Sequence, residues 1–129
     1  MIEKADPGPI HVMIVEDHEG FRKLMEVFVD GHPDLELLAQ AGSLAEARKH
    51  AAMSEVDVAV LDLGLPDGSG ADLIADLRRA SPDVRVVVLS ASLDPMGIEK
   101  ARLAGADEIL DKITPLDEVL ATVRCLGNA

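Results

Sequence analysis

The chain has 129 residues, enough for one domain with a sizeable hydrophobic core. Its formal net charge of −12 repels nucleic-acid backbones and anionic membranes, so we expect neither direct nucleic-acid binding nor membrane binding. Phe21 and Phe28 are its only aromatic residues, which argues against a surface that stacks bases. The single cysteine, Cys125, excludes an internal disulfide and fits a reducing cytoplasm.

The N-terminal segment, residues 1–9, is polar and contains two prolines. It predicts a disordered lead-in and lacks the features of a signal peptide. Beyond it, apolar runs alternate with helical patterns, and no stretch approaches the roughly 20 apolar residues that cross a bilayer. The runs that predict strands are 10–16, 35–41, 56–61, 84–89 and 108–110.

Capping residues mark where several helices begin. Ser43 and Glu46 form a capping box, with the serine as N-cap. Asp94 and Thr114 each precede a proline, which is favoured at the first helical position. With the apolar periodicity, these signals predict helices at about 19–30, 44–53, 71–80, 95–104 and 115–126.

Five alternations of strand and helix predict an α/β fold in three layers, with helices on both faces of a parallel sheet. At this length the doubly wound order 2-1-3-4-5 is expected for the five strands. In the first helix, Phe21, Leu24, Met25 and Phe28 share one face, which we expect to pack into the core. We assign residues 10–127 to this one domain and expect no output domain within the chain.

Chemically active side chains collect where the predicted strands end. Glu16 and Asp17 end the first strand, Asp62 follows the third, Ser90 follows the fourth and Lys112 follows the fifth. In the order 2-1-3-4-5, strands one, three, four and five are neighbours, and ligands of such sheets bind beyond the carboxyl ends. The sequence therefore predicts that three acids, a hydroxyl and an ammonium group meet on one rim.

Crowded carboxylates repel one another, and a hard divalent cation relieves the repulsion. Mg²⁺, or Mn²⁺ in its place, suits such oxygen ligands. We expect Asp17 and Asp62 to be direct ligands, Glu16 to act directly or through water, and the backbone carbonyl of Gly64 to supply another oxygen.

A carboxylate such as that of Asp62 can attack phosphorus and form an acyl phosphate. Lys112 would then neutralise phosphoryl oxygens together with the cation, and Ser90 would hydrogen-bond one of them. Each residue alone also fits an ordinary role: Asp62 in a turn, Glu16 and Asp17 as helix caps, Ser90 bonded to backbone, and Lys112 in solvent. Their joint position at neighbouring strand ends favours the phosphoacceptor hypothesis.

Four segments of the chain resemble the motifs of response-regulator receiver domains from two-component signalling. They are Val15-Glu16-Asp17-His18, the run VLDLGLPDGSG at 60–70, Leu89-Ser90-Ala91, and Gly105-Ala106-Asp107 leading to Lys112. The resemblance covers about residues 10–127. It implies a flavodoxin-like fold and a phosphoprotein in which Asp62 is the phosphoacceptor, Mg²⁺ the cofactor, and Ser90 and Lys112 the assisting groups.

The resemblance also implies partners and a mode of action. The phosphoryl donor would be a sensor histidine kinase or a histidine phosphotransfer protein. The domain would be no enzyme in the usual sense, although it would assist its own phosphorylation and dephosphorylation. Phosphorylation would rearrange the face formed by the fourth helix, fifth strand and fifth helix, which could also form a homodimer and control a partner or a transcriptional output domain.

Two positions depart from the family pattern. Ile109 stands where the family often has a switch aromatic, three residues before the lysine. Lys112 is followed by Ile113-Thr114-Pro115 and not directly by proline, a pattern that resembles receivers attached to helix-turn-helix DNA-binding domains. We expect His18 to be a surface or capping residue.

Three other functions compete with the phosphoacceptor hypothesis. A degenerate receiver that only binds partners stays open because of Ile109. An aspartyl-phosphate phosphatase of the haloacid-dehalogenase type would need a second acid two residues after the nucleophile, where this chain has Gly64. A flavodoxin is disfavoured because Glu16 and Asp17 place negative charge where a phosphate-binding loop is required.

Overall fold

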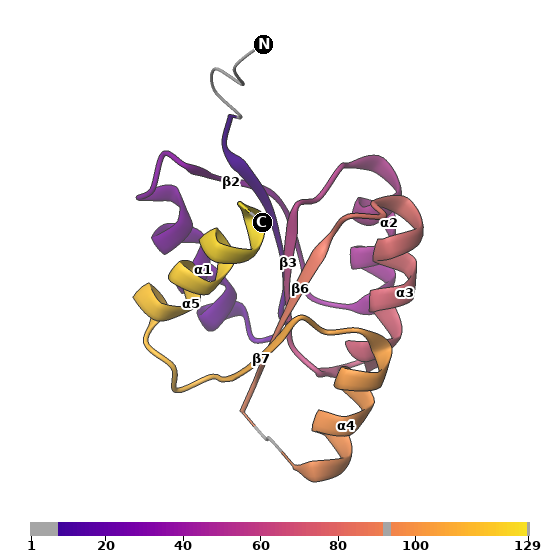
Figure 1. Ribbon diagram of the computed structural model, residues 1–129. Coiled ribbons are helices and arrows are strands. Elements are labelled where there is room, and N and C mark those ends of the chain that lie inside the picture. The colour runs from indigo at the N-terminus through magenta and orange to yellow at the C-terminus, as the bar shows by residue number, and fades with distance from the viewer. Residues whose placement is uncertain (1–7, 92–93, 129) are drawn as a thin grey trace.

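The computed structural model describes residues 8–91 and 94–128; the predicted lead-in lies mostly outside the described residues. A five-stranded parallel sheet forms the centre, with the order β2-β1-β3-β6-β7 (Figure 1). Its strands are β1 (Ile10–Val15), β2 (Leu35–Ala41), β3 (Val58–Leu61), β6 (Arg85–Ser90) and β7 (Glu108–Asp111). Counted along the chain without the separate β4–β5 hairpin, the order is 2-1-3-4-5, which confirms the predicted topology.

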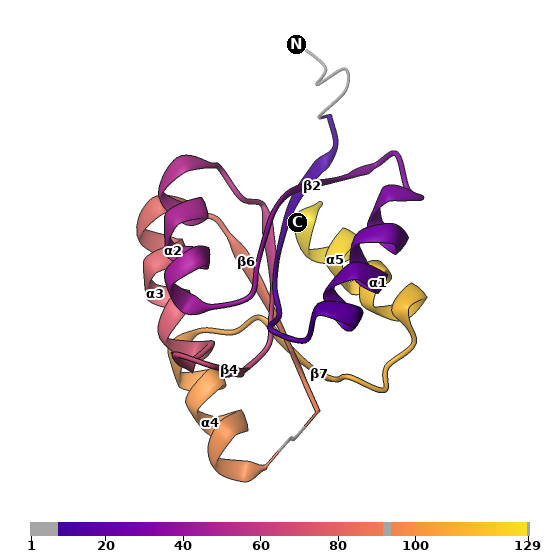
Figure 2. The same ribbon diagram turned by 180° about the vertical axis from the view of Figure 1, so that it is seen from behind.

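Helices cover both faces of the sheet. They are α1 (Glu19–Asp30), α2 (Leu44–Met53), α3 (Ala71–Ala80), α4 (Pro95–Ala104) and α5 (Leu116–Gly127). The first and last helices lie on one face, and the other three lie on the opposite face, as Figures 1 and 2 show from opposite sides. None of the described helices combines the length and apolarity needed to span a membrane.

The core consists of two apolar clusters, one on each side of the sheet. Met13 and Val15 of β1 pack toward the α2–α3–α4 side, whereas Val12 and Ile14 pack toward α1 and α5. This alternation explains why β1 reads as a nearly continuous apolar run, since both of its faces are covered. The prediction that Phe21, Leu24, Met25 and Phe28 of α1 all pack into the core is partly wrong. Met25 is buried, but Leu24 is 51% exposed.

The helix caps follow the sequence signals with one exception. Ser43 Oγ accepts from the Glu46 N–H (3.2 Å), while the Glu46 carboxylate accepts from the Gly42 N–H (2.7 Å). Asp94 caps α4 through the Gly97 N–H (2.8 Å), with Pro95 at the start of the helix. The prediction of Thr114 as N-cap of α5 is wrong. Pro115 occupies the N-cap position and has no side-chain acceptor, so the helix begins one residue later than expected.

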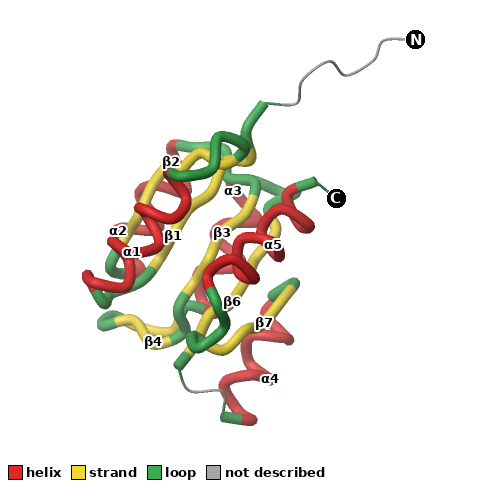
Figure 3. Tube along the Cα trace, turned by 90° about the vertical axis from the view of Figure 1, so that its left-hand side faces the viewer, coloured by secondary structure: helices red, strands yellow, loops and turns green. Residues whose placement is uncertain are grey.

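One element was missed from the sequence. After β3 the chain forms a small antiparallel hairpin, β4 (Gly64–Leu65) and β5 (Gly68–Ser69), separate from the main sheet. The hairpin lies at the carboxyl end of the strands, whereas both ends of the described chain lie at the opposite end (Figure 3). The strand ends that carry the candidate residues therefore share one rim with the hairpin.

Candidate functional site

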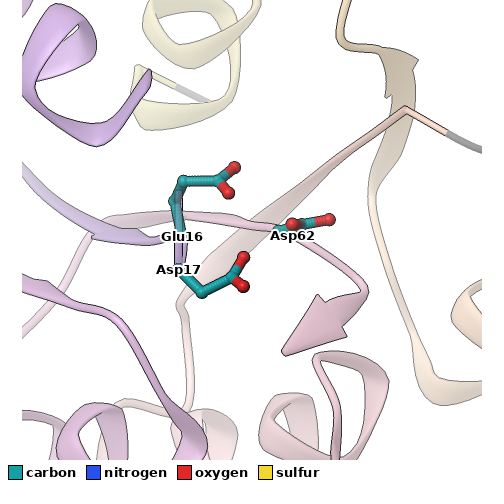
Figure 4. Close-up of side chains that lie close together, drawn as sticks. All are labelled: Glu16, Asp17 and Asp62. Atoms are coloured by element: carbon teal, nitrogen blue, oxygen red, sulfur yellow. The ribbon is translucent and has the colours of Figure 1, made fainter. Parts of the chain in front are cut away.

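The three acids gather at the carboxyl ends of β1 and β3. Backbone hydrogen bonds fix them there: Glu16 N–H donates to Ala41 O, and Asp62 N–H donates to Val15 O, both at 2.9 Å. One carboxylate oxygen from each of Glu16, Asp17 and Asp62 lies within 4.8 Å of the other two. Figure 4 shows the side chains of Asp17 and Asp62 directed toward a common space. Glu16 and Asp62 are buried, and Asp17 is exposed.

Lys112 reaches into this cluster from the loop after β7. Its Nζ lies 2.7 Å from Glu16 Oε1 and 3.2 Å from Asp62 Oδ2. The backbone N–H of Lys112 donates to Ser90 O (3.0 Å), which ties the lysine to the end of β6. Its ammonium group also lies 5.1 Å from the centre of the Phe21 ring, within the range of a cation–π contact. The lysine is therefore held by both charge and an aromatic face.

Burial and pairing act on these charges in opposite directions. Burial raises the pKa of Glu16 above its usual value, although hydrogen bonds from Lys112 and the His18 backbone oppose that effect. For Lys112, burial lowers the pKa, but hydrogen bonds to Glu16 and Asp62 outweigh it and leave the pKa raised. The lysine therefore stays charged at neutral pH, and the buried glutamate depends on it.

The oxygens of Glu16 are already engaged within the protein. Oε1 faces Lys112, and Oε2 accepts from the His18 N–H (3.0 Å). His18 in turn caps α1, since its Nδ1 accepts from the Phe21 N–H (3.0 Å), and this confirms its expected capping role. The alternative role of Glu16 and Asp17 as caps of this helix is therefore wrong.

The loop that follows Asp62 packs closely against the backbone of Asp62 and Leu63. Gly64 N–H donates to Asp62 Oδ1 (3.2 Å), and Gly70 N–H donates to Leu63 O (2.9 Å). A Cβ atom at Gly70 would lie 2.1 Å from the Asp62 carbonyl oxygen, so only glycine fits there. At Gly64 a Cβ would meet nothing within 4 Å.

An open pocket of about 360 Å³ lies beside the acids. Asp62, Gly64, Ser90 and Lys112 line it, together with residues of the β5 strand and of the start of α4. Ser90 is buried at the end of β6. The pocket therefore gives a small ligand access to the carboxylate of Asp62, while Ser90 beside it stays buried in the protein.

The donor set fits a divalent cation. Mg²⁺ binds oxygens at about 2.0–2.1 Å, so ligands around one ion lie about 3–4 Å apart. The spacing of the three carboxylates requires only small side-chain adjustments to meet this. Since both oxygens of Glu16 have protein partners, the residues favour direct binding through Asp17 and Asp62, with Glu16 acting through water.

The strand order thus brings together all the residues that the sequence singled out, and their chemical roles remain predictions. Sequence reasoning missed Phe21 as a neighbour of Lys112 and Asp67 as an acceptor for the start of α2. No local signal marks the first contact, because the two residues are 91 positions apart in chain order and on different elements. The acidic turn Pro66-Asp67-Gly68 offered a hint of the second.

Comparison with known proteins agrees with this geometry. The sequence pattern of the family described as the response regulator receiver domain matches residues 12–124. The chain belongs to this family. The DNA-binding transcriptional activator DevR/DosR of Mycobacterium tuberculosis is 35% identical over 92% of the chain and 54% of its own length. The KDP operon transcriptional regulatory protein KdpE of Escherichia coli is 38% identical over 88% of the chain and 49% of its own length.

Solved structures of receivers share the fold. A response regulator protein from Burkholderia pseudomallei, crystallised with a phosphorylated aspartic acid, calcium ion and citrate, superposes with a TM-score of 0.80. Its sequence identity is 26%, and the match covers 92% of this chain and 68% of that one. This receiver domain spans about half the length of the curated transcriptional regulators that it matches.

Proposed function

We propose that this receiver domain accepts a phosphoryl group on Asp62 in a reaction that depends on Mg²⁺ or Mn²⁺. The observation that supports it most is the placement of Lys112 between Glu16 and Asp62, which form one acidic cluster with the exposed Asp17. The phosphorylated aspartic acid and the calcium ion of the Burkholderia protein show that a relative with the same fold holds both groups.

In the proposed reaction, a carboxylate oxygen of Asp62 attacks phosphorus and an aspartyl phosphate forms. With a phosphohistidine donor, the P–N bond breaks and the histidine nitrogen leaves with its electron pair, then takes a proton from water. With acetyl phosphate, the P–O bond breaks and acetate leaves. Lys112, which contacts Asp62 Oδ2, is placed to pair with a phosphoryl oxygen, and Ser90 lines the pocket where that oxygen would lie.

Asp17, Asp62 and the backbone carbonyl of Gly64 would hold the cation, and Glu16 would act through water. When bound, the cation neutralises phosphoryl oxygens during transfer. Without a cation, the added charge of about −1.5 to −2 would enter a rim that already holds three carboxylates. The proposed phosphorylation therefore requires a cation, and Lys112 adds a second positive charge beside Asp62.

The partners follow from the same role. A sensor histidine kinase or histidine phosphotransfer protein in the cytoplasm would supply the phosphoryl group, and residues 10–127 would act as the receiver. The face made by α4, β7 and α5 would change on phosphorylation and control a homodimer, a partner or a transcriptional output domain. Two large apolar side chains are exposed on or next to these elements, Leu103 on α4 and Ile113 after β7.

Incubation with acetyl phosphate and Mg²⁺ tests the proposal. Mass spectrometry should show a gain of one phosphoryl group on a peptide containing Asp62, and none in Asp62→Asn. Glu19→Gln, which removes a nearby exposed acid in the first turn of α1, should react like the wild type. A wild-type protein that stays unmodified at saturating donor and cation would refute phosphoacceptance.

A receiver that only binds partners remains a second candidate, and Ile109 favours it. Ile109 is half-buried and packs against the core on the α4 side, and it lacks the ring that an aromatic switch would move. Beryllofluoride with Mg²⁺ distinguishes the two functions. Amide shifts spread over α4, β7 and α5 in NMR spectra support phosphorylation-driven switching, whereas shifts confined to the acidic rim support the second candidate.

A further inference from the structure

Asp67 lies at the tip of the β4–β5 hairpin and contacts a different helix. Its Oδ1 accepts from the Leu44 N–H (2.8 Å), and its Oδ2 accepts from the Ala45 N–H (3.1 Å). Both donors belong to the first turn of α2, whose N–H groups have no partner inside the helix. These two hydrogen bonds lower the pKa of Asp67, and the positive end of the helix dipole favours its charge.

The same contact is built into the neighbouring backbone. Gly68 has a φ of +149°, and a Cβ atom there would lie 2.6 Å from Leu44 Cδ1. A side chain at Gly68 would be strained by this φ and would displace the Leu44 side chain, so glycine allows the hairpin tip to pack closely on α2. Close packing and paired hydrogen bonds together hold the hairpin against the helix.

This contact links two parts of the acidic rim. On one side, α2 begins three residues after Ala41, whose carbonyl accepts from the Glu16 N–H. On the other side, the hairpin begins at Gly64, whose N–H donates to Asp62 Oδ1. Asp67 thus joins the segment that is anchored to Glu16 with the segment that leaves Asp62.

We propose that Asp67 is a positioning residue of the acidic rim, which holds Asp62 and Gly64 at the spacing from Asp17 that a divalent cation requires. The inference rests on the proposed function. Asp67 itself touches neither the cation nor the phosphoryl group. Its loss would release the hairpin tip and widen the range of positions available to Gly64, so the cation would bind more weakly to a rim whose ligands are all still present.

The test compares Asp67→Ala with Asp76→Asn in the same chain. Asp76 also contacts α2, through Arg48 (2.8 Å), but it does so from α3 and not from the hairpin. We expect Mg²⁺ titration to give a dissociation constant about 10- to 100-fold higher for Asp67→Ala, the range for a supporting residue of a metal site. Asp76→Asn should match the wild type, and saturating Mg²⁺ should return the acetyl phosphate reaction of Asp67→Ala toward the wild-type rate.

A readout without metal separates positioning from general stability. In the cation-free protein, the amide of Gly64 should exchange with solvent faster in Asp67→Ala than in Asp76→Asn, because only the first change frees the hairpin. If Asp67→Ala does not fold, Asp67→Asn decides, since one oxygen can still accept a hydrogen bond. We expect the Mg²⁺ dissociation constant and the Gly64 exchange rate of Asp67→Asn to lie between the wild-type values and those predicted for Asp67→Ala.

The outcomes discriminate between the two proposals. Unchanged Mg²⁺ affinity and unchanged Gly64 exchange in a folded Asp67 variant would overturn the positioning role alone. A wild-type protein that neither binds Mg²⁺ nor reacts with acetyl phosphate would overturn the proposed function. In that case, the Gly64 amide exchange rates of the Asp67 variants would still show whether Asp67 holds the hairpin.

Discussion

Lys112 Nζ lies 2.7 Å from Glu16 Oε1, and the glutamate side chain is only 2% exposed. A buried carboxylate that loses its partner is strongly destabilising, because its charge stays out of water without compensation. The lysine that is expected to serve phosphoryl transfer therefore also supports the folded state.

Lys112→Met should lower the free energy of unfolding at pH 7 by about 3 kcal/mol, measured by urea denaturation without divalent cations. The pKa of Glu16 is already raised by burial, and loss of the ammonium group raises it further. An acid with a raised folded-state pKa binds protons more tightly when folded, so the cost should shrink as the pH falls from 7 toward the unfolded value of 4.5 and level off there. Adding Glu16→Gln should recover part of the loss; a double variant less stable than Lys112→Met would contradict the pairing.

Asp17→Asn should weaken Mg²⁺ binding by more than the roughly 10- to 100-fold typical of outer-shell changes, because Asp17 would be a direct ligand. Isothermal titration would give the dissociation constants. Its matched control is Glu19→Gln, which removes an equal charge from the first turn of α1 but lies outside the acidic cluster. Equal losses in the two variants would mean that general electrostatics, and not ligation, governs cation binding.

Gly70→Ala should destabilise the fold by about 1–3 kcal/mol, the usual cost of forcing atoms into a packed site. The added Cβ would lie 2.1 Å from the Asp62 carbonyl oxygen, so the loop must shift. Gly64→Ala meets nothing within 4 Å and should leave the chemical denaturation midpoint nearly unchanged. Equal stability of the two variants would show that the loop adapts freely.

The contact between α2 and α3 predicts a pH dependence. Arg48 lies 2.8 Å from Asp76, and this hydrogen bond is the main cause of a lowered Asp76 pKa. An acid with a lowered folded-state pKa stabilises the fold above its unfolded value, 3.8 here, and loses this as the pH falls through the folded-state pKa. Asp76→Asn should therefore be about 0.5–1 kcal/mol less stable at pH 7, with the difference vanishing below pH 3.8. A constant difference over that range, measured by urea denaturation, would exclude the ion pair as its source.

Sequence patterns predicted most of the fold because their causes are local. The runs around Val58 and Val86 are apolar on both faces, as buried parallel strands require, and Asp94-Pro95 marks the start of α4 through its own hydrogen bond. Local signals failed at Thr114, where the backbone enters α5 without using the threonine, and at Leu24, which lies on the exposed side of α1.

The chain alone was enough to predict the five strand–helix alternations and which side chains follow each strand, since both are marked by neighbouring residues, and the doubly wound order expected for this pattern then placed the acids, Ser90 and Lys112 on one rim. Only the tertiary structure decided which charges touch. Lys112 pairs with Glu16 across 96 positions, and Asp67 caps a helix that begins 23 positions earlier. Such pairs form only where packed helices and strands bring two side chains to within about 3 Å. Residues far apart in the chain that meet in this way show no periodic pattern in the sequence.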